Sequence, residues 1–137
     1  MKIKFNKFAV LFFFLTFFLL ASNLFANNLK IENFTVVSLN ETNNTITYSC
    51  DISWDNSWRT TTNYDAIWVF LKYSTDAGMN WLHASMSNSG TTPSEFTAPA
   101  NFEIFVPSDE KGFFFQRTDY GAGTVTAEGV QFVWDYG

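Results

Sequence analysis

The chain has 137 residues, of which 20% are aromatic, and its 13 acidic and eight basic side chains give a formal net charge of −5. A protein that binds nucleic acid through phosphate contacts needs a basic stripe, whereas the few basic residues here are scattered along an acidic chain. The composition therefore excludes nucleic acid as a partner, and the single cysteine, Cys50, excludes an internal disulfide.

Residues 1–26 have the pattern of an export signal. Three lysines occupy the first seven positions, and the 13 residues 8–20 form an apolar run with Thr16 as its one polar side chain. This length lies within the roughly 7–15 residues of a signal peptide and is shorter than the ~20 needed to span a bilayer. We expect cleavage after Ala26, a secreted or periplasmic location, and no membrane attachment once the signal is removed. An uncleaved signal anchor is the alternative.

The mature chain, residues 27–137, is more acidic than the whole. Loss of the three leader lysines leaves five basic against 13 acidic side chains, a net charge of −8. Its length suffices for one domain that buries roughly 60–70% of its extended-chain surface. We therefore predict a single domain over residues 27–137.

The first predicted elements after the leader are strands. Residues 29–39 alternate weakly between apolar and polar, and residues 40–44 form a polar turn. Over residues 45–54 the alternation is complete through five periods, which is typical of a strand with one buried face. Residues 66–73 are apolar on both alternating sets, so they predict a central strand covered on both faces.

The second half of the chain alternates short strands with turns. We expect strands at 81–86, 95–98, 102–106, 113–117 and 130–136, separated by turns or loops at 76–78, 87–93, 107–112 and 119–123. No helical period of useful length follows the leader. The sequence therefore predicts an all-β fold, an antiparallel β-sandwich of about seven or eight strands, with a small barrel as the alternative.

Candidate catalytic groups are few. Cys50 lies on the apolar face of its strand, where a cysteine behaves as a small hydrophobe, and His83 is the one histidine. One cysteine and one histidine cannot fill four zinc positions, and Asp51, Asp55 and Asp65 lack the dense spacing of a calcium loop. Neither a nucleophile elbow nor a phosphate-binding glycine loop is present. We therefore expect a non-catalytic protein with no metal and no cofactor.

Candidate ligand-binding residues fall at two places. Trp58 and Arg59 follow the best-defined strand, in a polar connection where an indole and a guanidinium could stack on a sugar ring. Trp81 and His83 share one side of the strand predicted at 81–86. The structural alternatives are that Trp58 closes the end of the sandwich, that Arg59 pairs with a carboxylate, and that His83 packs on its strand. The partner classes that follow are an extracellular protein or a glycan, with the oligomeric state open.

Five segments of the mature chain carry a family resemblance. They are ISWDNSWR at 52–59, NYDAIWVFLKY at 63–73, WLHA at 81–84, GFFFQR at 112–117 and VQFVWDYG at 130–137. Residues 31–137 resemble the N-terminal β-rich region of secreted bacterial proteins of the formylglycine-generating, sulfatase-modifying-factor type. In those proteins the region precedes the catalytic domain, whose cysteines have no counterpart here. The resemblance implies an exported, non-catalytic accessory or interaction module, free-standing or part of a longer reading frame, and it transfers no residue role.

Overall fold

The computed structural model describes residues 27–137, and the export signal predicted at residues 1–26 lies outside this range. Within it the protein is all-β, its strands pair antiparallel, and no residue is helical. The strands are β1 (Lys30–Asn40), β2 (Thr45–Arg59), β3 (Ile67–Val69), β4 (Lys72–Tyr73), β5 (Leu82–His83), β6 (Ser85–Met86), β7 (Gly90–Thr91), β8 (Phe102–Val106), β9 (Phe113–Arg117) and β10 (Gly121–Asp135). None of the described residues forms a helix that could cross a membrane.

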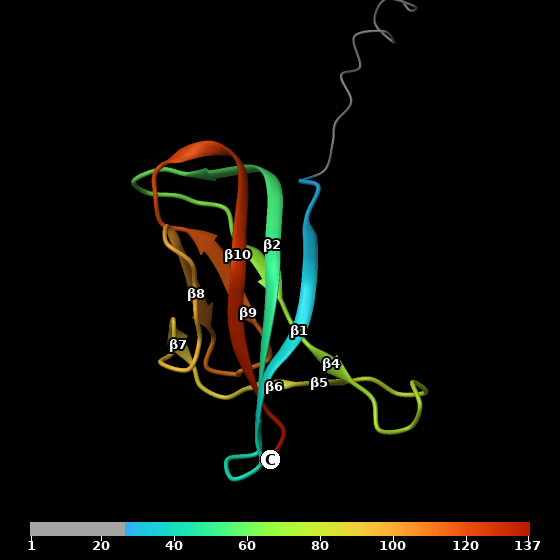
Figure 1. The fold of residues 1–137 in the computed structure, drawn as a ribbon. Helices are drawn as coiled ribbons and strands as arrows, with labels where there is room; N and C mark the ends of the chain where they lie inside the picture. Colours follow the sequence, from blue (N-terminus) through green and yellow to red (C-terminus); the bar gives the residue numbers. More distant parts are fainter. Residues whose placement is uncertain (1–26) are drawn as a thin grey trace, which may run out of the picture.

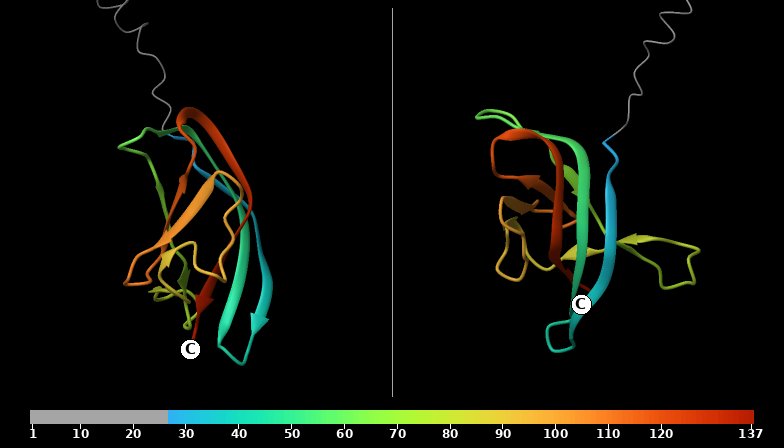
Figure 2. Two further views of the ribbon diagram at one scale, coloured as in Figure 1. Left: turned by 90° about the vertical axis from the view of Figure 1, so that its left-hand side faces the viewer. Right: turned by 45° about the horizontal axis from the view of Figure 1, so that its top comes forward.

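The strands form two four-stranded sheets and one separate hairpin (Figure 1). Sheet A has the order β1-β2-β10-β6, and sheet B has the order β3-β9-β8-β7. Figure 2 shows the two sheets as two layers, with the long strands β2 and β10 in one and β8 and β9 in the other. The β4–β5 hairpin projects away from both layers, on the side of β1.

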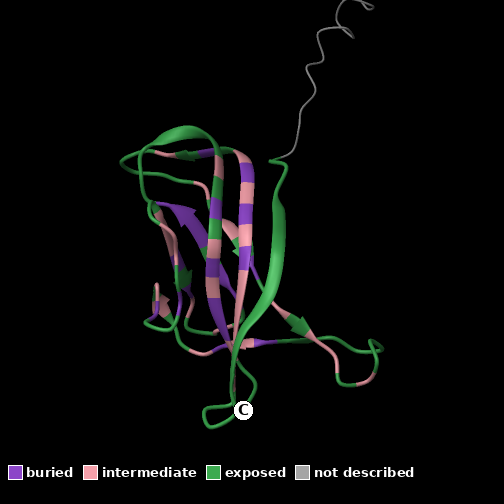
Figure 3. Ribbon diagram, in the orientation of Figure 1, coloured by how far each residue is buried: buried purple, intermediate pink, exposed green. Residues whose placement is uncertain are grey.

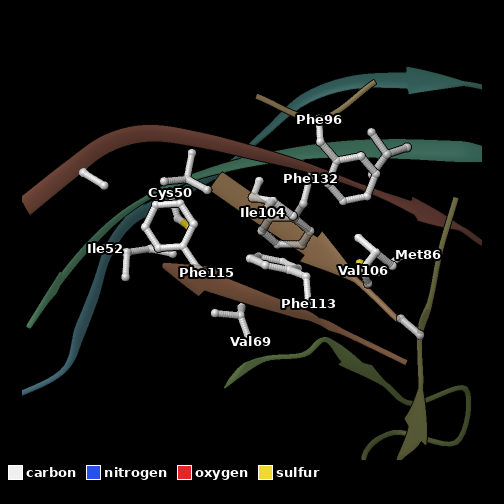
Figure 4. Packing of buried hydrophobic residues seen from close by; sticks show 14 of the residues in the cluster. Cys50, Ile52, Val69, Met86, Phe96, Ile104, Val106, Phe113, Phe115 and Phe132 are labelled. Atoms are coloured by element: carbon white, nitrogen blue, oxygen red, sulfur yellow. The ribbon is translucent and has the colours of Figure 1, made fainter. Parts of the chain in front are cut away.

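The space between the sheets is filled by apolar side chains (Figure 4). Ile52 on β2, Ile104 on β8 and Phe115 on β9 are completely buried, as is the much larger Trp54, whose ring centroid lies 6.1 Å from that of Phe115. Phe102 stacks on Phe115 with ring centroids 5.1 Å apart. These aromatic contacts join sheet A to sheet B, since Trp54 comes from one sheet and both phenylalanines come from the other.

The alternation predicted for residues 45–54 is confirmed over residues 49–54, where Cys50, Ile52 and Trp54 are buried and their neighbours in sequence are not, whereas residues 45–49 are all half-buried. Cys50 is a free, buried cysteine, as the sequence predicted. Burial raises the pKa of its thiol to about 11, and the nearby Asp51 carboxylate adds to the rise. The thiolate is therefore disfavoured, and Cys50 serves as a core residue.

β2 and β10 are both longer than the sequence predicted. β2 continues to Arg59 and pairs there with the start of β10, where Gly123 lies opposite Ser57. Asn56 adopts a positive φ of 58°, and after it Ser57 is the buried residue. The register shift near this point breaks the period of two. The prediction relied on that period, so at this end of the ladder it assigned both strands, the residues after 54 and the turn at 119–123, to polar connections.

The predicted central strand at 66–73 is wrong. The segment splits into β3, which is an edge strand of sheet B, and β4, which belongs to the hairpin. Trp68 and Phe70 are exposed, so only one alternating set of the segment faces the core. The segment at 81–86 likewise splits into β5 and β6, and the segment at 95–98 makes only a bridge between Thr97 and Gln131. In addition, β7 lies within the loop predicted at 87–93. The two splits, the loss of the strand at 95–98 and the extra β7 together explain why residues 27–137 contain ten strands where seven or eight were expected.

Candidate ligand-binding site

The outer face of sheet B carries a row of aromatic side chains. In the ladder Trp68 of β3 lies opposite Phe114 of β9, and Phe114 lies opposite Phe105 of β8. Residues directly opposite each other in an antiparallel pair project from the same face. The three side chains are 38–42% exposed, and the rings of Trp68 and Phe114 lie 4.7 Å apart. The sequence run at 113–115 produces this row because strand alternation buries Phe113 and Phe115 and turns Phe114 outward.

Gly112 allows β9 to begin close to β3. A Cβ atom at this position, where φ is +148°, would lie 2.6 Å from the carbonyl oxygen of Val69 and 2.8 Å from the indole of Trp68. Only glycine fits such an approach without displacing the backbone of β3. The glycine therefore fixes where Trp68 lies relative to Phe114.

A polar pair lies on the same outer face, two residues along from the aromatic row. Gln116 of β9 is opposite Glu103 of β8, and its side-chain amide donates a hydrogen bond to the Glu103 carboxylate. Gln116 is only 7% exposed, whereas the Glu103 side chain retains more contact with solvent. Buried polar groups in such a position are held in one orientation by their hydrogen bonds. The amide thus fixes the carboxylate at the surface.

Arg59, at the end of β2, contacts the same carboxylate. Its Nη1 lies 3.8 Å from Oε1 of Glu103 and donates a 2.8 Å hydrogen bond to the carbonyl oxygen of Arg117. The Arg59 guanidinium also lies over the ring of Tyr64, 4.6 Å from its centroid. A guanidinium with a fixed backbone partner and an aromatic neighbour loses little further freedom on binding a ligand.

Several of these side chains line a pocket of about 470 Å³. It is lined by Tyr64, Ala66, Thr91, Glu103, Phe105, Phe114 and Gln116. Aromatic rings form one part of the lining, and a carboxylate, an amide and two hydroxyl groups form the other. A mostly apolar wall with a few placed polar groups is the usual composition of a small-molecule site.

The residues that the sequence singled out lie in different parts of the molecule. Arg59 contacts two residues that line the pocket, Glu103 and Tyr64, and its contact with Glu103 is the carboxylate pairing considered as its structural alternative. Trp58 immediately precedes Arg59 but projects from the opposite face of β2. Ser57 and Arg59 share a face of the strand, and Ser57 on that face is buried, whereas Trp58 is exposed. Trp81 and His83 are exposed on or beside the β4–β5 hairpin, far from the end of β2 (Figure 1). The His83 ring packs against Phe70, 5.5 Å between centroids.

Sequence reasoning missed most of the pocket. Tyr64, Glu103, Phe105, Phe114 and Gln116 were assigned to strands or connections and given no role. Alternation within two short strands was the available signal: in FEIFV at 102–106 and FFFQR at 113–117, every second residue must face away from the core. Those outward residues include Phe105 and Phe114, which lie side by side once β8 and β9 pair and so form part of a contiguous apolar patch.

The aspartates considered as calcium ligands serve separate structural purposes. Asp65 accepts hydrogen bonds from the Trp54 indole (2.8 Å), the Ser57 hydroxyl (3.2 Å) and the Trp58 backbone (2.8 Å). Asp55 accepts one from Thr124. Among residues 27–137 no three or more His, Cys, Asp or Glu side chains are grouped so that they could hold a metal ion.

Glu103 is the one carboxylate among the described residues that line the pocket. A scan against protein-family models, a search of curated proteins and a search of solved structures each found no match for this chain. The geometry of the pocket is therefore the main basis for a functional proposal.

Proposed function

We propose that the chain is an exported, non-catalytic accessory module with a β-sandwich fold, which binds carbohydrate in the pocket on the outer face of sheet B. The observation that carries the proposal is the exposed aromatic row of Trp68, Phe114 and Phe105 beside the braced pair of Glu103 and Gln116. The apolar leader and the resemblance to accessory regions of sulfatase-modifying-factor type proteins support export and a non-catalytic role.

A sugar ring matches both parts of the pocket lining. Its C–H groups form an apolar face that packs on aromatic rings, and its hydroxyl groups donate to carboxylate and amide oxygens. The pocket volume of about 470 Å³ falls within the roughly 300–1,000 Å³ of small-molecule sites. Because Glu103 contributes a negative charge and the mature chain is acidic, the preferred ligand is a neutral glycan.

The experiment is a glycan array followed by calorimetry on the protein purified from cells that express the full chain. We expect binding of a neutral glycan, a Kd about three- to tenfold higher in Phe105→Ala, and a loss of about tenfold or more in Glu103→Gln. Trp81→Ala is the matched control, because Trp81 is an exposed aromatic residue outside the pocket. It should leave the Kd unchanged.

Two results would reject the proposal. One is the absence of glycan binding by a folded protein. The other is a glycan whose Kd responds to Trp81→Ala and not to Phe105→Ala, which would move the site to the β4–β5 hairpin. Circular dichroism on each variant shows whether the fold is retained, since Phe105 and Glu103 lie on an outer face and contribute little to the core.

A further inference from the structure

β1 presents a free edge to solvent. It is the terminal strand of sheet A, and among residues 27–137 its one strand partner is β2. Its 11 residues extend roughly 36 Å, and every one of them is exposed (Figure 3). The strand contains no proline, and its two charged side chains, Lys30 and Glu32, lie at one end. Its protection consists of two register shifts, between Glu32 and Thr35 and between Val36 and Ser38, with Asn33 at a positive φ of 52°. The rest of this long edge leaves its backbone groups free to pair with another strand.

β1 also presents an uncovered apolar face. Ile31, Val36 and Leu39 lie opposite residues of β2 that face the inter-sheet side, and Phe34 stacks on Tyr48 with ring centroids 5.0 Å apart. These four β1 side chains are 48–58% exposed. No strand of sheet B makes comparable contact with β1, so the apolar row continues the core face beyond the edge of the second layer. Soluble proteins rarely leave such a row without a partner.

The order of residues in β1 is self-complementary about Thr35. Two register shifts against β2, one on either side of Thr35, place Ile31, Phe34, Val36 and Leu39 on the inter-sheet face, although their spacing is not a strict period of two. In an antiparallel pair of two β1 strands centred on Thr35, Ile31 lies opposite Leu39 and Phe34 lies opposite Val36, so apolar side chains meet on that face. On the other face Glu32 lies opposite Ser38, and Thr35 lies opposite its own copy. Lys30 faces Asn40, so no two like charges are opposed. A two-fold interface requires this property, because the same patch must serve both partners.

We propose that β1 pairs antiparallel with β1 of a second copy of this chain, which forms a homodimer with sheet A continuous across the two-fold axis. Pairing satisfies the free backbone groups of the edge and brings the two apolar rows side by side on the inter-sheet face. The inference does not rest on glycan binding, because β1 lies in sheet A and the pocket lies on the outer face of sheet B.

The first test measures the mass of the purified protein across a wide concentration range by sedimentation. We expect a dimer, and we expect Thr35→Lys to weaken it about tenfold or more because the two lysines would face each other at the axis. Thr35 is exposed and on the polar face, so the monomer should fold normally. Thr62→Lys, which adds the same charge in an exposed loop, is the matched control and should leave the dimer intact.

The second test fixes the register with cysteines. Opposed residues in an antiparallel pair have Cα atoms roughly 4.5–5.5 Å apart, within disulfide range. Thr35→Cys should therefore form a disulfide-linked dimer on mild oxidation. Glu32→Cys and Ser38→Cys should cross-link when the two proteins are mixed and not when each is oxidised alone. The native Cys50 is buried and does not compete.

A monomer at every concentration would overturn the proposal. So would a dimer that Thr35→Lys leaves intact and that Thr35→Cys fails to cross-link, because another surface would then form it. Binding of β1 to a strand of a different protein, with no self-association, would also overturn it.

Discussion

β1 and β2 lie side by side in one sheet, yet only one of them is buried. β2 alternates between buried and partly buried residues over its central part, whereas all residues of β1 are exposed (Figure 3). Ile31 and Ile52 are direct partners in the ladder and share a face, but their exposed fractions are 48% and 0%. The difference arises because sheet B covers β2 and stops short of β1. Burial in this protein is thus decided by the second layer and not by the apolar pattern of the strand.

Matched substitutions at this isoleucine pair should produce the largest contrast. Ile52→Ala removes a fully buried side chain and leaves a cavity, so we expect the free energy of unfolding to fall by about 2–5 kcal/mol. Ile31→Ala removes the same atoms from a half-exposed position and should cost about 1 kcal/mol or less. Urea denaturation followed by tryptophan fluorescence measures both values.

The comparison needs a monomer, because pairing of β1 with a second copy would bury Ile31. Both substitutions are therefore made in the Thr35→Lys background. Equal costs at the two positions would show that β1 is covered in solution by some other part of the chain, and the account of burial by sheet B would fail. If Ile31→Ala lowers the unfolding free energy only in the protein without Thr35→Lys, then β1 of the second copy is what covers Ile31 in the dimer.

A second contrast concerns the end of β2, which extends past β1 and depends on Asp65. Asp65→Ala leaves the buried Trp54 indole and the Ser57 hydroxyl without their acceptor. We expect a loss of about 1–3 kcal/mol, the usual cost of an unsatisfied buried donor. Asp55→Ala is the control, because that carboxylate accepts a single exposed hydrogen bond from Thr124, and the change should cost well under 1 kcal/mol. A similar loss of unfolding free energy in both variants would show that the hydrogen bonds that Asp65 accepts from Trp54 and Ser57 do not stabilise this end of β2.

The sequence predicted the all-β class and the centre of β2 because both follow from local alternation. Cys50, Ile52 and Trp54 are buried as their spacing indicates. It did not predict which strands meet: β3 was expected at the centre of a sheet and lies at an edge. Apolar residues in both alternating sets indicate that the segment has two apolar faces. They do not show which part of the chain, if any, covers each face.

The pocket was harder to predict than the fold, because it depends on register across four segments. Phe105 and Phe114 are adjacent because β8 and β9 pair in one alignment. Arg59 lies on the face from which it contacts Glu103 because the register shift after Trp54 changes the alternation of β2. Trp58 attracted attention as an aromatic residue next to an arginine. In a strand, however, consecutive residues point to opposite faces, so that pairing in sequence argued against a shared site.

The smallest expected effect concerns the link between β1 and the rest of sheet A at low pH. Asp51 of β2 accepts hydrogen bonds from the Asn33 side chain of β1 (2.6 Å) and the Gly129 backbone (2.8 Å), and these bonds lower the pKa of its carboxyl group. A lowered pKa in the folded state contributes stability that is present above the unfolded value near 3.8 and is lost as the pH falls through the folded value. Acid should therefore loosen β1 before it affects the core.

Urea unfolding at a series of pH values checks this in the Thr35→Lys background. The unfolding free energy of Asp51→Asn should decline less steeply below about pH 4 than that of the parent. Asn33→Gly removes the side-chain donor while tolerating the positive φ of 52° at that position. In the Asn33→Gly protein, Asp51→Asn should change the pH dependence of the unfolding free energy less than it does in the parent. The reason is that the hydrogen bond from Asn33, the largest cause of the lowered Asp51 pKa, is absent. Identical pH profiles for the parent and Asp51→Asn would mean that Asp51 does not hold β1, and that the ladder with β2 alone fixes this exposed strand.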